Sequence, residues 1–519
     1  MAEAGSPHPG SRGRHAWNGA GGKKLSGVQA DDEEEAEIRT IADVRKPIAW
    51  VCVLAAGVLI MVLILIPPVV GVADNGDFSR VMGVSGIAPL HPNEPYAERY
   101  FAYAQADYAY GGYTQGGYVS THILLVAISG WISRLFNASH YDIRYLGVCY
   151  LALLLTAIAL IVRHSPAFAG KRATAVLASI LGGVFVWIFA DIGYVAYFHS
   201  FFGEPYALVG MLLAVSSALA SAEKPSGGLL ALFTAAALAV ATAKIQNAPL
   251  GFVFGLLAWR LAALRPDDRS WRRRTLACAG ILALGSAIML VAAPNRLVHT
   301  NLYQSIFYGV LKDSPDVASD MRELGIPEKY AGLAGTNYFQ KNTVIPQRDP
   351  TLRREVLEKL GHKDIALFYL KHPDRFVAKL KRAAESGSMV RPYYLGNFEK
   401  EAGKKPGTLS YRFSSWSEWK HRHWPRSLAG FALFFFAYLA IAAVWRLRTR
   451  SRGVRFALET LAVVAFAGLF SFVIPLIGDG EADLGKHLFM FNVCFDMMVV
   501  SVLFGAAYGC VRLIYTRKG

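Results

Sequence analysis

Charged side chains are scarce in this sequence: Asp, Glu, Lys and Arg make up 18% of its 519 residues, whereas an ordinary soluble domain carries about 25%. Apolar residues reach 54% and gather in runs of about 16–22 residues, long enough to cross a hydrocarbon core about 30 Å thick. The scarcity of charge excludes a cytosolic protein and a disordered regulator. It leaves a transporter, a channel or a membrane enzyme.

Cysteine is also rare, with five residues in the whole sequence. None of them forms a CxxC pair or lies at metal-ligand spacing from a histidine, so we interpret them as packing residues of the apolar runs. The sequence also lacks a Walker loop, a dinucleotide-binding glycine motif, a zincin helix and a haem motif. It therefore predicts no soluble nucleotide site.

Eleven apolar runs are present, and they predict an all-α polytopic membrane protein with about 10–11 transmembrane helices. The runs cover residues 48–72, 118–136, 145–162, 173–190, 206–221, 228–243, 249–264, 275–293, 428–445, 456–477 and 488–511. We expect residues 48–293 to form an N-terminal transmembrane module with its first outer loop at 73–117. Residues 428–511 then form the C-terminal transmembrane helices.

Polar segments flank and interrupt these runs. Residues 294–427 predict an extracytoplasmic, mainly helical domain, here called the insertion. Residues 1–47 are rich in Gly, Ser, Ala and charge and predict a disordered cytoplasmic tail. Residues 512–519 predict a short second tail in the cytoplasm.

The formal net charge of +16 could indicate nucleic-acid binding, but its distribution indicates membrane orientation instead. Residues 265–274 and 446–455 each contain five Arg and lie between apolar runs. Basic loops of this kind mark the cytoplasmic side of a membrane. With both loops inside, both termini are cytoplasmic and the insertion is outside. The run at 118–136 then cannot be a simple crossing: it is re-entrant, or residues 96–117 supply the other half of a hairpin.

Four polar clusters fall on the outer face in this topology, and the first is the DNGDFSR segment at 74–80. Asp74 or Asp77 could act as a general base or a metal ligand, with Arg80 as an anion partner. The alternative is an Asp that caps a helix and forms a salt bridge with Arg80. Ionisable residues at span ends are functional candidates because they are costly there.

The other three clusters also lie beside apolar runs. Glu204 ends the second cluster at 191–204 and could cap the following helix. Together with His199 and Ser200 it also suggests nucleophilic catalysis, although residues adjacent in sequence rarely form a catalytic triad. In the third cluster, Lys244 could snorkel to the interface or hold a phosphate. The fourth cluster, DGEADLGKH at 479–487, holds three carboxylates and two possible cations, more than a connecting loop requires.

The insertion predicts helices at about 318–331, 351–360, 362–371 and 373–386. After them, the segment from Arg391 to Asn397 predicts a compact turn whose end residues could reach a ligand. Tyrosines crowd residues 96–118. They indicate an aromatic belt at the lipid–water boundary or, alternatively, a platform for sugar stacking.

A span, an outer loop opening with acidic residues, many further spans and an external domain together resemble the GT-C superfamily of membrane glycosyltransferases. Several strings also resemble bacterial cell-surface glycan hexose transferases of the S-layer glycosylation type. They include YFHSFFGEP at 197–205, ATAKIQN at 241–247, FYGVL at 307–311, RELGIPEKYAGLAGTNYF at 322–339, YLKHPDRF at 369–376, RPYYLGNFE at 391–399 and GDGEADLGKHLFMFN at 478–492.

The resemblance implies an inverting transfer of a hexose from a polyprenyl-phosphate donor to a cell-surface glycan or lipid-linked acceptor at the outer face. Asp77 or Asp74 would be the general base, or a ligand of a divalent cation in some members. The residues implied for the donor phosphate are Arg80, Lys244, Lys486 and His487. The residues implied for substrate contacts are Glu204, Gln246, Asn247, Asp479, Glu481, Asp483, Arg391 and Asn397.

Two other functions remain open at this point. A flippase or exporter of lipid-linked or small polar substrates needs polar residues at mid-span depth, whereas here they gather at the span ends. An accessory or sensor protein would use the insertion for binding alone. The expected partners are the lipid-linked donor, the acceptor and membrane lipids, with no nucleic acid.

Overall fold

The computed structural model describes residues 27–112, 119–168 and 170–516 and confirms an all-α polytopic membrane protein. Within this part of the chain, nine helices are long and apolar enough to cross a membrane, and the shorter apolar helix α9 packs against α8, α10 and α11. These ten helices are α1 (Gly27–Ile64), α5 (Arg144–Arg163), α6 (Lys171–Phe189), α8 (Gly203–Glu223), α9 (Gly227–Ala243), α10 (Ala248–Leu261), α11 (Arg269–Val291), α18 (Leu428–Arg448), α19 (Arg452–Gly478) and α21 (Phe489–Thr516). Helix α1 begins at Gly27, so residues 27–47 are helical although composition predicted them to be part of a disordered tail.

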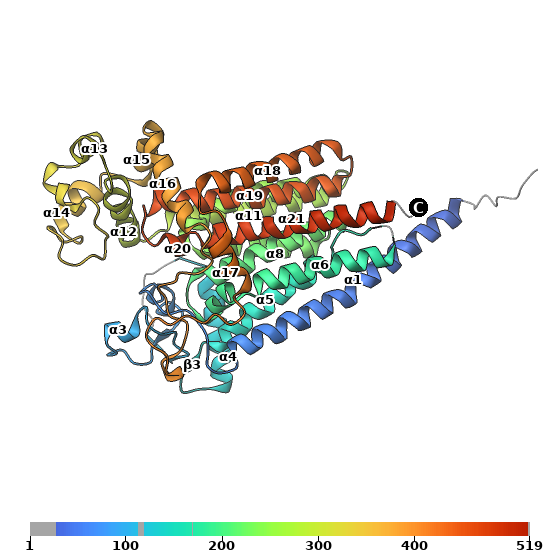
Figure 1. The fold of residues 1–519 in the computed structure, drawn as a ribbon, viewed down its shortest axis with the longest axis horizontal. Coiled ribbons are helices and arrows are strands. Elements are labelled where there is room, and N and C mark those ends of the chain that lie inside the picture. The colour runs from blue at the N-terminus through green and yellow to red at the C-terminus, as the bar shows by residue number, and fades with distance from the viewer. Residues whose placement is uncertain (1–26, 113–118, 169, 517–519) are drawn as a thin grey trace, which may run out of the picture.

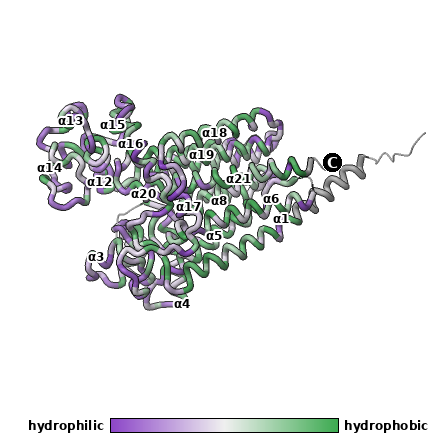
Figure 2. The backbone as a smooth tube through the Cα atoms, viewed as in Figure 1, coloured by the Kyte–Doolittle hydropathy of each residue, from purple (hydrophilic) through white to green (hydrophobic). Residues whose placement is uncertain are grey.

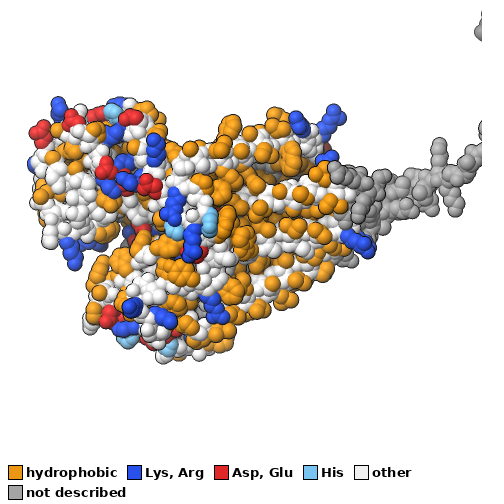
Figure 3. Space-filling view, viewed as in Figure 1, with side chains coloured by type: hydrophobic (Ala, Val, Ile, Leu, Met, Phe, Trp, Pro, Cys, Tyr) orange, Lys and Arg blue, Asp and Glu red, His pale blue; other side chains and the backbone are white. Residues whose placement is uncertain are grey.

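The two ends of the bundle differ (Figure 1). The C-terminus and the start of α1 lie at one end, and the insertion projects from the other. Hydrophobic residues predominate along the helices between the ends (Figure 2), and their side chains form a broad belt on the surface (Figure 3), as expected for a surface that faces lipid tails. We call the first end the basic end and the second the insertion end.

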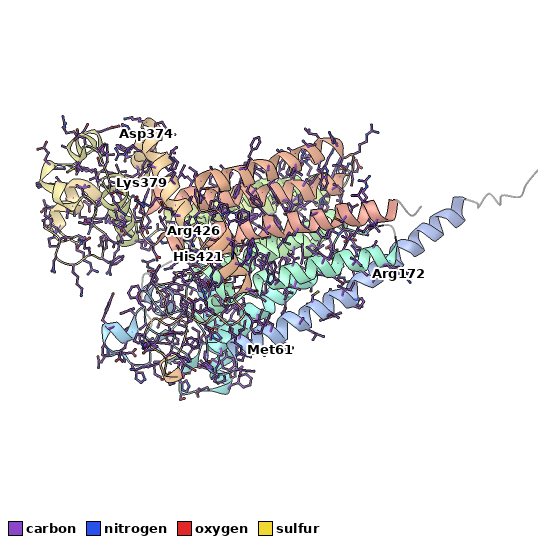
Figure 4. The ribbon with its side chains drawn as sticks, viewed as in Figure 1. Met61, Arg172, Asp374, Lys379, His421 and Arg426 are labelled. Atoms are coloured by element: carbon purple, nitrogen blue, oxygen red, sulfur yellow. The ribbon has the colours of Figure 1, made fainter. Side chains whose placement is uncertain are left out.

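Ion pairs join the loops of the basic end. Arg45 bonds to Glu223 at 2.6 Å, and His164 approaches the same carboxylate at 2.7 Å. Arg446 and Arg260 share Glu459 at 2.7 and 2.9 Å. The basic loops predicted to lie on one side of the membrane therefore do lie together, with Arg172 at the same end (Figure 4).

The run at 118–136 does not cross. It forms α4 (His122–Phe136), which starts where Ser120 donates to the carbonyl of Thr242 at 2.8 Å. It ends where the Tyr110 hydroxyl donates to Ser133 and to the carbonyl of Asn137. These contacts lie at the insertion end, so both ends of α4 lie there and the helix does not cross to the basic end. Residues 96–112 supply no second span.

Short elements close the insertion end around a small sheet. Strands β1 (Ile87–Pro89), β2 (Asp107–Tyr110) and β3 (Tyr141–Asp142) pair antiparallel in that order. The remaining short helices there are α2 (Ser79–Met82), α3 (Tyr96–Arg99), α7 (Ile192–Val195), η1 (Ala196–His199), η2 (Ile245–Asn247) and α20 (Leu484–His487), and η3 (Ala262–Leu264) continues α10 at the basic end.

The predicted segments 362–371 and 373–386 are helical throughout, whereas the segment predicted at 318–331 is interrupted at Gly325, which has a left-handed φ of +69°. The insertion is mainly helical, with ten helical elements. They are α12 (Asn295–Ser305), η4 (Ile306–Val310), α13 (Val317–Leu324), η5 (Glu328–Leu333), α14 (Pro350–Leu352), η6 (Arg353–Leu357), α15 (His362–Lys371), α16 (Pro373–Ser386), η7 (Lys400–Ala402) and α17 (Ser415–His423). Residues between Leu302 and Tyr369 build a hydrophobic core of their own. Residues from Ala383 to Trp416 instead join the core of the bundle, so the second part of the insertion is anchored on the helices.

Candidate functional site

The predicted polar clusters meet at the insertion end of the bundle. Lys486 bonds to Asp77 at 2.5 Å across 409 positions of sequence. Lys244 bonds to Glu204 at 2.7 Å, and the Gln246 amide donates to the carbonyl of His487 at 2.8 Å. We call the side chains brought together here the polar cluster; they are Asp74, Asp77, Arg80, Glu204, Lys244, Asp479, Asp483, Lys486 and His487.

A tight turn positions the two carboxylates of the first loop. Gly76 adopts φ +101°, which only glycine takes without strain. One carboxylate oxygen of Asp74 accepts hydrogen bonds from the amides of Gly76 at 2.7 Å and Phe78 at 3.1 Å. This side-chain turn starts α2 and directs Asp77 and Arg80 into the polar cluster.

Asp77 lies between two cations. Its carboxylate contacts Lys486 at 2.5 Å and Arg80 at 3.0 Å. Burial alone would raise the pKa of Asp77, but the charges of Lys486 and Arg80 outweigh burial and hold that pKa below its usual value. Asp77 is therefore an anion that organises the cations around it.

Lys486 is the most enclosed cation of the cluster, with 1% of its side chain exposed. Its ammonium lies 4.2 Å above the ring of Phe202. Burial would lower the pKa of Lys486, but the nearby carboxylates of Asp77 and Asp483 raise it above its usual value. Lys486 therefore remains charged in a position where an anionic ligand could replace a carboxylate.

Asp74 faces a different environment from Asp77. Burial raises the pKa of Asp74 to about 6, against the lowering effect of its two amide hydrogen bonds. The residue lines a cavity of about 190 Å³ with an apolar wall and a few polar groups. The polar residues around that cavity include Ser79, Arg99, Gln105 and Tyr108. A carboxylate that titrates near neutral pH beside a cavity has the properties of a general base.

The 479–487 loop approaches the insertion closely. Gly480 has φ +61°, and a Cβ there would lie 2.6 Å from the carbonyl oxygen of Gln304. The Gln304 amide donates to Asp479 at 2.9 Å, which ties α12 to the loop. Asp483 also adopts a left-handed φ of +48°, a region that Asp enters more readily than most other non-glycine residues.

Some buried acceptors of the cluster have no hydrogen-bond partner. They include one carboxylate oxygen each of Asp483 and Glu204. Burial raises the pKa of Asp483 to about 7, in opposition to the charge of Lys486. Buried polar groups without partners are rare in folded proteins, so these two oxygens retain unused capacity to accept hydrogen bonds.

His487 differs from the expected phosphate-binding cation. Its Nδ1 lies 3.2 Å from Asp479. Burial, followed by the charges of Lys244 and Lys486, lowers the pKa of His487 well below its usual value. Its imidazole is therefore neutral near pH 7 and can donate a hydrogen bond without carrying charge.

Three predicted substrate contacts are engaged elsewhere. Glu481 binds Lys312 and Lys379, each at 2.6 Å, and so connects the loop to the insertion; Figure 4 labels Lys379 on α16. Arg391 bonds to Glu418 at 3.1 Å. Asn397 donates to the carbonyl of Gly71 at 2.7 Å. Their partners lie far away in sequence, which is why the pattern of residues alone suggested ligand contacts.

Asn247 is buried at the start of α10. The sequence did not predict that Gln304 contacts the polar cluster or that polar side chains line the Asp74 cavity. Among these residues, only Tyr108 lay in a pattern that had been noted, the tyrosine-rich segment. Within residues 27–112, 119–168 and 170–516, no three His, Cys, Asp or Glu side chains are grouped as metal ligands.

A second buried network lies beside the polar cluster and is fully satisfied. Lys420 binds Asp496 at 2.5 Å and Asn492 at 2.7 Å. Tyr194 and Trp416 donate to the other oxygen of Asp496 at 2.6 and 2.8 Å. The network holds α17 and α7 against α21, and its complete pairing indicates a structural role.

Comparison with known proteins gives one result. The family described as the YfdI N-terminal transmembrane domain matches residues 35–513. No curated protein and no solved structure matches the chain. Because the match covers more than half of the 519 residues, this chain belongs to the YfdI N-terminal transmembrane domain family.

Proposed function

We propose that this protein is a membrane glycosyltransferase of the GT-C type that moves a hexose from a polyprenyl-phosphate donor to a cell-surface glycan or lipid-linked acceptor. YfdI is a membrane glycosyltransferase-like protein, and membership of its family supports this class. The observation that carries the proposal is the polar cluster, in which Asp77 holds two cations beside the cavity of Asp74.

The donor half of the reaction needs positive charge more than acid catalysis. A polyprenyl phosphate leaves with a negative charge, which preorganised cations stabilise in a site with little water. Asp77 pairs with Lys486 and Arg80. Glu204 pairs with Lys244. We infer that the donor phosphate takes over part of these contacts and that neutral His487 adds a hydrogen bond.

The acceptor half needs a base. In the proposed reaction the acceptor oxygen bonds to the anomeric carbon while the bond from that carbon to the phosphate oxygen breaks, with inversion. The proton of the acceptor hydroxyl moves to Asp74, and the electron pair leaves with the polyprenyl phosphate. Asp74 suits this role because burial raises its pKa to about 6 and it lines a cavity, whereas Asp77 is paired with two cations.

The unpartnered oxygens of Asp483 and Glu204 are proposed to accept hydrogen bonds from hexose hydroxyls. Because basic loops mark the cytoplasmic side, the polar cluster is proposed to open on the extracytoplasmic side.

The test is transfer by the purified protein from a synthetic polyprenyl-phosphate hexose to a crude cell-envelope acceptor. Asp74→Asn and Asp77→Asn are compared with Asp374→Asn, a control in an exposed position on α16 (Figure 4). We expect loss of transfer in the first two variants and wild-type transfer in the control. Undiminished transfer in both variants would refute the assigned site. Movement of the intact donor across the membrane without transfer would favour a flippase.

A further inference from the structure

The insertion contains a second cavity, separate from the polar cluster. It has a volume of about 340 Å³. Basic and polar side chains dominate its lining, which carries no carboxylate; they include Arg296, His299, Tyr338, Gln347, Arg348 and Arg353. Burial and the charge of Arg353 lower the pKa of His299, so the positive charge at this cavity comes from the guanidinium groups. All three are exposed, and they attract an anion to the space between them.

Most of this charge is not neutralised by the protein. Arg353 pairs with Glu358 at 2.8 Å. Arg296 and Arg348 have no ion pair within the described part of the chain. Asp349, next to Arg348 in sequence, uses its carboxylate to cap α14 through two amide bonds of 2.8 Å. Two guanidinium groups at this cavity are therefore available to a ligand.

The position of the cavity suggests the source of the anion. Arg296 is the second residue of α12, which begins four residues after the membrane-spanning α11 ends at Val291. The link between the two helices is not helical, and a chain spans at most about 3.6 Å per residue. Arg296 therefore lies within about 18 Å of the end of the span, near the depth at which lipid phosphates lie. Guanidinium groups bind phosphate oxygens in a bidentate manner, so phosphate suits this site better than a neutral sugar does.

Helix α12 connects the two sites. Its first turn lines the cavity, and Gln304 in its last turn donates to Asp479 of the polar cluster. Eight residues separate Arg296 from Gln304, which is about 12 Å along a helix. Two phosphate groups could therefore be bound at once, one at each end of α12.

We propose that Arg296, Arg348 and Arg353 bind a phosphate or pyrophosphate group of a membrane-anchored acceptor, while the polar cluster binds the donor phosphate. The role in acceptor binding rests on the proposed function, whereas the anion site itself does not. Of the two acceptor classes in the proposed function, a cell-surface glycan and a lipid-linked acceptor, this site favours a lipid-linked glycan that carries phosphate.

The first experiment measures pyrophosphate binding by calorimetry with the full-length protein in nanodiscs of zwitterionic lipid. We expect Arg296→Gln combined with Arg348→Gln to weaken binding at least tenfold. Arg354→Gln is the matched control, because Arg354 is exposed beside Arg353 but does not line the cavity. Equal binding by the wild type and the double variant would overturn the site, and so would loss of all binding in Lys486→Met.

The second experiment compares a polyprenyl-pyrophosphate glycan with the same glycan released from its lipid. We expect the double variant to raise the KM for the lipid-linked acceptor at least tenfold, with the KM for the donor and the use of the released glycan unchanged. Equal effects on both acceptors would overturn the acceptor role. If the wild type binds pyrophosphate through these arginines but transfers no hexose, the proposed function fails and the acceptor role fails with it, while the anion site stands. Pyrophosphate titrations of the wild type and the double variant in nanodiscs that contain anionic phospholipid then test whether bulk lipid headgroups compete for the anion site.

Discussion

Replacing Asp74 with Asn removes the proposed base while it preserves the turn that holds it. The carboxylate oxygen that accepts hydrogen bonds from the amides of Gly76 and Phe78 has an equivalent in the Asn amide oxygen. The loop should therefore keep its conformation, and Asp77 should keep its contacts with Lys486 and Arg80. A loss of transfer would then report on the chemistry and not on the fold.

The expected change of the transfer rate with pH follows from the pKa of Asp74. With a pKa of about 6, roughly a tenth of the carboxylate is ionised at pH 5 and roughly nine-tenths at pH 7. Because a base acts in its ionised form, transfer by the wild type should rise roughly tenfold between these pH values. Loss of a general base lowers rates by about 10²–10⁴, so we expect kcat of Asp74→Asn to fall within that range.

The assay is transfer of labelled hexose at saturating donor, measured from pH 5 to pH 8 for the wild type and Asp74→Asn. The residual rate of the variant should no longer rise with pH near 6. A variant that keeps more than a third of the wild-type rate would refute the role of Asp74. A wild-type rate that does not change between pH 5 and pH 7 would also refute it.

Four further predictions follow from the same structure. Because folding raises the pKa of Asp74, its ionisation destabilises the folded state as pH rises through about 4–6; Asp74→Asn should melt at a higher temperature than the wild type at pH 7 and equally at pH 4. Lys486→Met should raise the KM for the donor at least tenfold in transfer assays, since a hydrogen bond to a charged group contributes about 1.5–3 kcal/mol, and an unchanged KM would contradict phosphate binding there. Gly480→Ala should lower the melting temperature and the transfer rate, because its Cβ would lie 2.6 Å from a carbonyl oxygen; Gly478→Ala, where a Cβ meets nothing within 4 Å, is the control. Lys420→Met should destabilise the protein by about 3–5 kcal/mol because it leaves a buried carboxylate unpaired, and a melting curve equal to that of the wild type would contradict the structural role.

The architecture of the bundle was predictable because it depends on local sequence. Apolar runs of sufficient length have few alternatives in a membrane, and the basic loops indicated which helix ends lie together. The same reasoning predicted that 118–136 does not simply cross, since a further crossing would have placed the basic loops on opposite sides. The structure agrees with each of these points.

The chemistry of individual residues was less predictable because it depends on distant partners. Asp74 and Asp77 are three positions apart, yet Lys486 approaches only Asp77 closely enough to bond. The sequence suggested that Arg391 contacts a ligand, whereas in the structure it pairs with Glu418. The cavity beside Asp74 arises from the pairing of β1 with β2, in a segment whose tyrosines first indicated a membrane belt.

The most direct measurement follows the chemical fate of the donor. The protein is reconstituted in liposomes with polyprenyl phosphate that carries a labelled hexose, and acceptor glycan is supplied on the outside. We expect the label to move onto the acceptor, free polyprenyl phosphate to appear in equal amount, and Asp74→Asn to abolish both changes. Intact labelled donor that only changes leaflet, with no free polyprenyl phosphate, would contradict the proposed transfer.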